Sequence, residues 1–203
     1  LYVIYNSLYT KNTMKYPCPG IVVHPPVDAK RYKVVKRGSK LTLINLYERK
    51  GGLFIQQLAR LMPDRDFLGV EGGYGKQEKI NLPNIAYLPH TKDIKKIYAQ
   101  TRILLMPSKY ESYGRTAVEA MASGIPVIAA PTEGLKESLG DAGIFCELNE
   151  QDWVNAISKL DDEEEYKKAS KKCLERFKEI SLQSPVELAE MEKFLTDIVA
   201  RKL

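Results

Sequence analysis

The sequence has few of the residues that build disulfide frameworks, metal centres or membrane spans. It has three cysteines, Cys18, Cys146 and Cys173, with no Cys-x-x-Cys pair, and only two histidines. An odd number of widely spaced cysteines favours neither a disulfide framework nor a structural metal site, and is typical of a reducing cytoplasm. No run of roughly 18 apolar residues and no signal-peptide pattern appears in these 203 residues. It opens on Leu1 and not on methionine, which we interpret as a fragment of a longer protein.

Size and charge indicate one ordinary globular unit. The 203 residues are 44% hydrophobic and 28% charged, enough to bury one substantial core. The net charge of +5 is modest, but the first forty residues contain a single acid, Asp28. Their basic residues are Lys11, Lys15, Lys30, Arg31, Lys33, Lys36, Arg37 and Lys40. Such a cluster fits membrane lipid or a solvated linker equally well, whereas nucleic acid is a poor fit because no recognition module accompanies it.

Short apolar runs alternate with helical patterns from residue 41 onward. The runs are residues 41–45, 66–71, 84–88, 102–106, 126–130 and 143–146, and helical spacing of apolar residues appears in 52–62 and 93–100. This rhythm predicts an α/β fold with a doubly wound, Rossmann-like parallel sheet of about six strands. Beyond residue 150 the pattern predicts flanking helices over residues 151–160, 163–178 and 185–202.

Polar and glycine-rich segments follow the predicted strands at their carboxyl ends. They are residues 45–52, 71–75, 89–90, 108–114 and 131–134. Because ligands of open α/β sheets bind outside the carboxyl ends of the strands, we expect these five loops to converge on one cleft. Residues 71–75 lack the Gly-x-Gly-x-x-Gly spacing of a dinucleotide fingerprint, so we interpret them as a tight loop.

Glu111 and Glu119 lie in the most informative stretch of the chain. An apolar strand over residues 103–106 precedes them, and residues 115–122 are rich in helix formers. Glu111 would therefore lie in a loop, and Glu119 about two turns along a helix, with free backbone N–H groups between them. Such N–H groups attract phosphate, and carboxylates accept bonds from sugar hydroxyls, so the pattern fits a sugar diphosphate. The spacing alone also fits two solvated residues on a surface helix.

The ends of this helix carry their own signals. Ser112 is a candidate N-cap, and Gly114 allows another backbone to approach closely. Gly124 followed by Pro126 is a stop signal, which predicts that the helix ends near Ser123.

The whole string Pro-Ser-Lys-Tyr-Glu-Ser-Tyr-Gly-Arg-Thr-Ala-Val-Glu-Ala-Met-Ala-Ser-Gly-Ile-Pro-Val resembles the Glu-x7-Glu signature of retaining family 4 glycosyltransferases, also called group 1. The resemblance covers about residues 20–150. It implies the C-terminal, nucleotide-sugar-binding half of a two-domain GT-B fold, with the N-terminal acceptor domain missing. It also implies three parts: residues 1–28 as the end of the first domain and the linker, 29–180 as the Rossmann-like domain, and 181–203 as a C-terminal helix. Asn6 and Ser7 would lie in the exit strand, and residues 25–28 in the linker.

The resemblance also implies site residues. Lys50 and Gly51 match the Lys-Gly pair of the family, and Lys50 would neutralise the diphosphate while Glu111 meets the donor sugar. Glu119 would hold the ribose hydroxyls. The backbone of Ser112, Tyr113, Gly114 and Arg115 would face the phosphates and the sugar. The usual arginine of the family falls on Asn45, which leaves Arg49 as the candidate to reach the same oxygens.

Four further expectations concern the histidines, Glu133 and metals. His90 follows the third strand at the ligand edge and is a candidate contact for the base or ribose, whereas His24, next to two prolines, is interpreted as a linker residue. Glu133 either selects a hydroxyl pattern of the donor or faces solvent. Retaining enzymes of this family usually need no metal, and the chain has no Asp-x-Asp motif, so we expect neither a metal nor another cofactor.

The leading hypothesis is the donor-binding domain of a retaining glycosyltransferase that moves a hexose from a nucleoside-diphosphate sugar to a saccharide or lipid acceptor. We expect a cytoplasmic location with peripheral membrane contact, and no efficient turnover by this chain alone. A sugar-nucleotide epimerase half-domain and a non-catalytic nucleotide-sugar binding module remain as alternatives. A dinucleotide-dependent dehydrogenase is disfavoured because the glycine fingerprint is lacking. The sequence does not specify the base, the sugar, the acceptor or the linkage.

Overall fold

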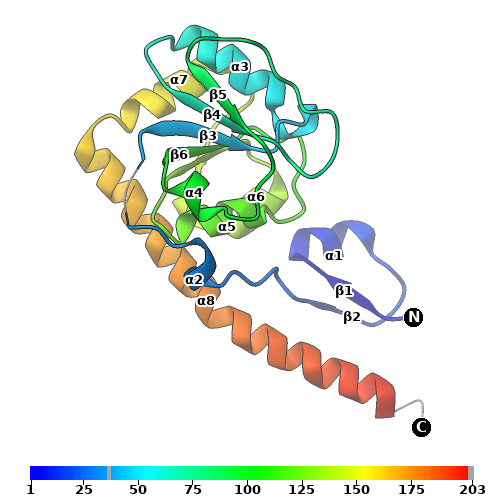
Figure 1. Ribbon diagram of the computed structural model, residues 1–203. Helices are drawn as coiled ribbons and strands as arrows, with labels where there is room; N and C mark the ends of the chain where they lie inside the picture. Colours follow the sequence, from blue (N-terminus) through cyan, green and yellow to red (C-terminus); the bar gives the residue numbers. More distant parts are fainter. Residues whose placement is uncertain (36–37, 201–203) are drawn as a thin grey trace.

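A six-stranded parallel sheet forms the centre of the molecule in the computed structural model, which describes residues 1–35 and 38–200 (Figure 1). Its strands are β3 (Lys40–Ile44), β4 (Phe67–Val70), β5 (Ile85–Leu88), β6 (Thr101–Met106), β7 (Val127–Ala129) and β8 (Ile144–Phe145), and each falls on one of the six predicted runs. Their spatial order is β5-β4-β3-β6-β7-β8, with every neighbouring pair parallel. The predicted doubly wound fold is therefore confirmed. Lys36, Arg37 and Lys202 lie outside the described residues.

The strands are apolar along their length because helices cover both faces of the sheet. One face is covered by α3 (Gly52–Leu61) and α7 (Glu150–Lys159), which bury Ile55 and Trp153. The other is covered by α4 (Lys95–Tyr98), α5 (Arg115–Met121), α6 (Glu133–Leu139) and the middle of α8 (Glu163–Ala200) (Figure 1). The predicted helices at 52–62, 93–100 and 115–122 are present, the second only as a short turn. The sequence did not predict α6, whose seven residues are too few for a clear periodic pattern.

α8 differs from the prediction because it is one helix where two were expected. It runs from Glu163 to Ala200 and contains Pro185 in its interior. A proline there removes one intrahelical hydrogen bond and does not by itself end the helix when packing holds both sides. Phe177 and Ile180 are buried before the proline and Glu187 after it, so tertiary contacts hold both sides.

A smaller unit precedes the main sheet. β1 (Val3–Tyr5) and β2 (Gly20–Val22) form a parallel pair connected by α1 (Leu8–Met14), and the extended residues 25–28 lead from it to α2 (Ala29–Tyr32). Asn6 and Ser7 follow β1 and do not lie in it, because Ser7 caps α1 by accepting a hydrogen bond from the Thr10 N–H at 3.0 Å. The distal part of α8 reaches this unit, where Phe194 packs edge-on against Tyr2 with ring centroids 6.0 Å apart (Figure 1).

Candidate functional site

A cavity of about 440 Å³ opens at the carboxyl ends of β3 and β6, where the strand order reverses. The predicted loops after β3, β4, β5 and β6 all contribute to its wall. The fifth predicted loop does not, because none of residues 131–134 lines it. Instead, the start of α6 packs against the neighbouring loop: a Cβ on Gly134 would come within 2.2 Å of the Glu111 carbonyl oxygen. The prediction of five convergent loops is thus correct for four of them.

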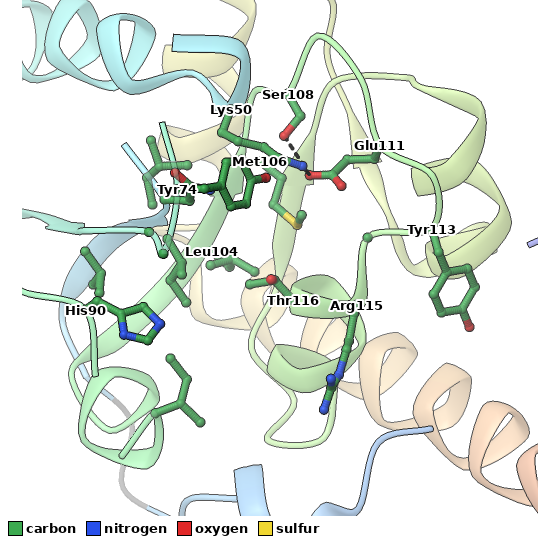
Figure 2. A pocket seen from close by; sticks show the side chains of 18 of the residues that line it. Lys50, Tyr74, His90, Leu104, Met106, Ser108, Glu111, Tyr113, Arg115 and Thr116 are labelled. Atoms are coloured by element: carbon green, nitrogen blue, oxygen red, sulfur yellow. Dashed lines mark hydrogen bonds and ion pairs between the residues drawn. The ribbon is translucent and has the colours of Figure 1, made fainter. Parts of the chain in front are cut away.

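Lys50, Glu111 and Ser108 meet at one end of the cavity (Figure 2). Lys50 Nζ lies 2.6 Å from Glu111 Oε1, and the two side chains are 20% and 12% exposed. Ser108 Oγ donates a hydrogen bond to the same carboxylate oxygen at 3.0 Å. Lys50 and Glu111, both predicted site residues, therefore form one ionic unit, whereas Ser108 was predicted only as the first residue of the loop 108–114.

Gly51 positions Lys50 from outside the cavity. Its φ of 97° is left-handed, and a Cβ there would come within 2.2 Å of the Pro107 ring. Only glycine allows the chain to turn this close to the strand that leads to Glu111. Gly51 is not among the cavity-lining residues, so it fits a supporting role.

Arg49 does not lie where the family arginine was expected to act. It is absent from the cavity lining, and its carbonyl accepts the backbone N–H of Lys109 at 2.9 Å. Asn45 does line the cavity, with a left-handed φ of 76°, and its Oδ1 accepts the Tyr47 N–H at 3.1 Å. Asparagine tolerates this backbone conformation because its side chain bonds locally.

The loop after β4 is held by Gln77, which the sequence did not single out. Gln77 Oε1 accepts the N–H groups of Leu46 at 2.9 Å and Gly72 at 2.8 Å. Its Nε2 donates to the Tyr74 carbonyl at 2.8 Å. Tyr74 lines the cavity, and His90 lies at the side opposite Glu111, as expected for a contact to the far end of a long ligand (Figure 2).

The segment from Ser112 to Arg115 lines the cavity as predicted, but Ser112 is not the helix cap. Gly114 caps α5 with a φ of 85°, and the Ser112 hydroxyl instead accepts a hydrogen bond from Asn6 Nδ2 at 2.9 Å. The predicted helix stop is confirmed, since Gly124 has a left-handed φ of 65°. The Tyr113 ring points away from the cavity, and its burial raises the pKa of its hydroxyl to about 12 (Figure 2).

Glu119 lies beside the main cavity and does not line it. It lines an adjoining pocket of about 230 Å³ that shares Arg115 with the cavity. Tyr98 donates its hydroxyl hydrogen to Glu119 Oε2 at 2.9 Å, and Arg115 Nε lies 3.2 Å from Oε1. Burial raises the pKa of this carboxyl, and the Tyr98 hydrogen bond and the Arg115 charge only partly oppose that effect. The ribose-binding role of Glu119 stays a prediction.

The structure also shows the surroundings of Glu133, His24 and Asn6. Glu133 is exposed and pairs with Lys136 at 2.8 Å, so in this structure it faces solvent. His24 lies in the linker segment but contacts two glutamates, which the sequence did not indicate. Asn6 lines the cavity although it comes from the small N-terminal unit, and no local pattern could have placed it there.

Residues 1–35 and 38–200, which the structure describes, contain neither a cluster suited to a metal ion nor a helix suited to a membrane span. No group of three or more histidine, cysteine, aspartate or glutamate side chains in them is arranged to hold a metal ion. None of the helices in this part of the chain is both long and apolar enough to cross a membrane.

Comparison with known proteins places the chain among sugar-transferring enzymes. A family model described as "Glycosyl transferases group 1" matches residues 44–163. O-antigen chain mannosyltransferase B of Escherichia coli is 31% identical over 102 residues, which are 49% of this chain and 26% of that protein. A D-inositol 3-phosphate glycosyltransferase of Corynebacterium aurimucosum is 41% identical over 71 residues, 34% of this chain and 17% of the relative.

Solved structures share the fold at lower sequence identity. Sucrose-phosphate synthase of Thermosynechococcus elongatus matches 98% of this chain and 59% of its own with a TM-score of 0.80 and 19% identity. HepE of Anabaena, crystallised with UDP and glucose, matches 96% of this chain and 62% of its own, again with a TM-score of 0.80 and 19% identity. The chain thus spans about a quarter or less of these two curated relatives and about three fifths of the two structures.

Proposed function

This chain belongs to the group 1 glycosyltransferases, and from that premise we propose that it is the donor-binding part of a retaining, family 4 enzyme. The enzyme would transfer a hexose from a nucleoside-diphosphate sugar to a saccharide or lipid acceptor. Two structural neighbours were solved with UDP bound, which supports a nucleotide sugar as the ligand class. The transferase names of the curated relatives favour this function over an epimerase half-domain.

The observation that carries the proposal is the ion pair of Lys50 and Glu111. It lies at one end of a cavity located where the strand order of the sheet reverses. A sugar diphosphate needs a cation for its phosphates and acceptors for its hydroxyls within a few ångströms of each other. Lys50 Nζ has three N–H donors, of which the contact with Glu111 uses one. The remaining donors can bind a diphosphate without breaking the pair.

The proposed roles follow the geometry of the cavity. The diphosphate would lie between Lys50 and the backbone around Gly114, with the sugar against Glu111. The nucleoside would extend toward His90, at the opposite side of the cavity. Glu119, next to Arg115 in the adjoining pocket, would hold the ribose.

In the proposed reaction the bond between the anomeric carbon and the diphosphate oxygen breaks, and its electron pair stays on the diphosphate. The acceptor hydroxyl forms the new bond on the same face of the sugar, and its proton passes to the released diphosphate. Negative charge therefore grows on the diphosphate in the transition state, where a fixed cation is commonly worth several kcal/mol. Lys50 is placed to supply that charge.

The remaining parts of the proposal concern the whole enzyme. Residues 1–28 would end an acceptor-binding domain and form the linker, residues 29–180 would bind the donor, and 181–203 would form a C-terminal helical part. The acceptor would be reached through the other domain. The basic N-terminal residues, such as Lys30 and Arg31 of α2, would allow peripheral contact with a membrane from the cytoplasm. We propose no metal requirement for the reaction.

A nucleotide panel tests the proposal directly. The melting temperature of the chain would be measured with UDP, GDP, ADP, CDP and dTDP. Saturation at about 100 times the dissociation constant adds about 2.7 kcal/mol, which raises the melting temperature of a protein this size by several degrees. A shift that is selective for one base would support a donor domain and identify its nucleotide.

The opposite result would also be informative. If a folded sample shows no shift with any of the five nucleotides, the donor-domain proposal fails for this chain. A non-catalytic module would then be favoured. In it, Asn45 stands in place of the family arginine, and phosphate binding has been lost. An epimerised sugar nucleotide as product, with no transfer to an acceptor, would instead favour the epimerase.

A further inference from the structure

His24 makes three short polar contacts that tie separate parts of the molecule together. Its Nε2 lies 2.7 Å from Glu137 Oε1 of α6, and its Nδ1 lies 2.7 Å from Glu187 Oε1 of α8. Its backbone N–H also donates to Glu187 Oε2 at 2.8 Å. The three side chains are only 16%, 16% and 9% exposed. The linker is thus held to two helices by one imidazole.

These contacts suit a ring that donates from both nitrogens. An ionised carboxylate can only accept hydrogen bonds, and a neutral imidazole has a single N–H to donate. Both nitrogens of His24 face carboxylate oxygens, so both contacts are hydrogen bonds to ionised carboxylates when the ring is a doubly protonated imidazolium. Arg176 of α8 lines the same small pocket of about 210 Å³, where it donates to the backbone carbonyl of Glu137 at 2.8 Å. Tyr113 is the remaining titratable side chain in this pocket.

The imidazole also contacts the loop that forms the proposed donor site. The His24 ring packs on the Tyr113 ring with centroids 4.8 Å apart. Tyr113 lies between Glu111 and Gly114 in sequence, and its ring points away from the cavity (Figure 2). His24 therefore contacts the loop through a ring that lies outside the cavity. A shift of this ring would therefore move the backbone that lines the cavity.

Glu137 extends the connection to the small N-terminal unit. Its two carboxylate oxygens accept the N–H groups of Leu8 at 2.7 Å and Tyr9 at 2.9 Å, at the start of α1. Asn6, just before α1, donates to the Ser112 hydroxyl. Hydrogen bonds of Glu137 and Asn6 and the ring contact of His24 with Tyr113 therefore connect the N-terminal unit, the linker and the donor loop.

We propose that His24 is a positioning residue for the donor site: its imidazolium bridges Glu137 and Glu187 and, through Tyr113, fixes the loop from Glu111 to Gly114 relative to the N-terminal unit. The assignment of a site role rests on the proposed function, whereas the bridge itself does not. Partly buried charges of this kind are costly unless every partner is present, so the network has one well-defined arrangement.

Substitutions at His24 separate the effect of its positive charge from the effect of its side-chain size. His24→Gln removes the positive charge and keeps a single amide donor, which cannot serve both glutamates. His24→Arg keeps the charge and offers a planar set of N–H donors that can bond two carboxylates. Glu190→Gln is the matched control, because Glu190 is an exposed glutamate of the same helix as Glu187. We expect UDP affinity to fall about tenfold in His24→Gln and in Glu187→Gln, to recover in His24→Arg, and to stay unchanged in Glu190→Gln.

Two measurements report on the bridge without any bound nucleotide. Because the chain has only His24 and His90, an NMR spectrum of protein labelled with ¹⁵N-histidine contains two imidazoles, and the His24 ring should show two protonated nitrogens. Hydrogen exchange of the amides in residues 112–115 should be faster in His24→Gln than in the wild type and in Glu190→Gln. A singly protonated His24 ring, or exchange in this loop that is unchanged by His24→Gln, would overturn the proposal.

UDP titration then tests the link to the donor site. Binding should move the ring signals of His90, which lines the cavity, and also those of His24, which the cavity does not include. Movement of His90 alone would overturn the positioning role while leaving the donor site in place. If UDP moves neither ring and no nucleotide of the panel binds, the proposed function fails, and the ring protonation and loop exchange still decide whether the bridge exists.

Discussion

At the scale of single residues, the site depends on side chains that come from distant positions in the chain. Lys50 ends the short helix η1 (Glu48–Lys50), and its partner Glu111 lies beyond the end of β6. Ser108 donates a hydrogen bond to the same carboxylate oxygen. The pair has low exposure, so its charges are screened less by solvent than a surface ion pair would be.

We expect Lys50→Ala to weaken nucleoside-diphosphate binding by about 2–5 kcal/mol, because it removes the cation from a partly buried polar site. Isothermal titration with the best nucleotide of the panel measures this loss. The matched control is Lys109→Ala, since Lys109 pairs with Glu48 at 3.1 Å on the same side of the sheet but is 57% exposed. Equal losses in both variants would contradict a specific role for Lys50.

Glu119 leads to a prediction about pH. Burial raises the pKa of its carboxyl above the usual 4.5, so the folded chain holds this proton more tightly than the unfolded chain does. The stability that this proton contributes is fully present below the unfolded pKa and is lost as pH rises through the folded pKa. Glu119→Gln, which mimics the neutral form, should therefore gain stability relative to the wild type as pH increases across that window.

Urea unfolding of the wild type and Glu119→Gln at several pH values from about 4 to 7 measures this difference. Glu190→Gln serves as the exposed control and should follow the wild type at every pH. Parallel stability curves for Glu119→Gln and the wild type would show that the carboxyl titrates alike in the folded and unfolded chains.

At the scale of elements, α8 shows how packing overrides a local signal. The helix passes through Pro185, although the residue before a proline disfavours helical backbone. Tertiary contacts on both sides maintain it, with Ile180 packed on the second face of the sheet and Glu187 bonded to His24. The proline is therefore a weak point inside an otherwise continuous helix.

Pro185→Ala should strengthen α8, because an alanine restores the N–H that bonds to the Ser181 carbonyl and removes the steric conflict of the ring. Proline in a helix interior is about 3 kcal/mol less favourable than alanine, and we expect about 1–3 kcal/mol of that to be regained. Hydrogen exchange over residues 181–190 measures the gain. Val186→Ala, at a position that is 56% exposed, is the control and should leave exchange nearly unchanged.

At the scale of the whole molecule, a chain that carries only the proposed donor site is expected to bind the sugar nucleotide without transferring the sugar efficiently. Many enzymes complete the site only when a second unit closes over the substrate and excludes water. Here the cavity is open at the edge of the sheet, and Asn6 of the small N-terminal unit already contributes to its wall. The cavity edge next to Asn6 is where a second domain would complete the proposed site.

The 203-residue chain should therefore bind the nucleotide but transfer sugar slowly or not at all. A transfer assay with UDP-glucose, using the release of UDP as the readout, checks this, with Lys50→Ala as the background. Addition of a separately expressed N-terminal domain should raise the rate. Multiple turnovers by this chain alone would contradict the two-domain proposal.

The sequence by itself determined the sheet and the main part of the site. Apolar runs of strand length specify six buried parallel strands, because only residues covered on both faces can be so uniformly apolar. The same order of elements places the loops after the strands at one edge. Within those loops, the resemblance to the family pointed to Lys50, Glu111 and the segment around Gly114, all of which line the cavity.

Only the tertiary structure decided what those residues touch. The continuity of α8 through Pro185, the solvent-facing place of Glu133 and the bridge of His24 all depend on segments more than a hundred positions apart or on packing around them. Hydrogen bonds and ion pairs between distant side chains carry no periodic signal in the sequence. They follow from how the elements pack, and they therefore become visible only when the fold is complete.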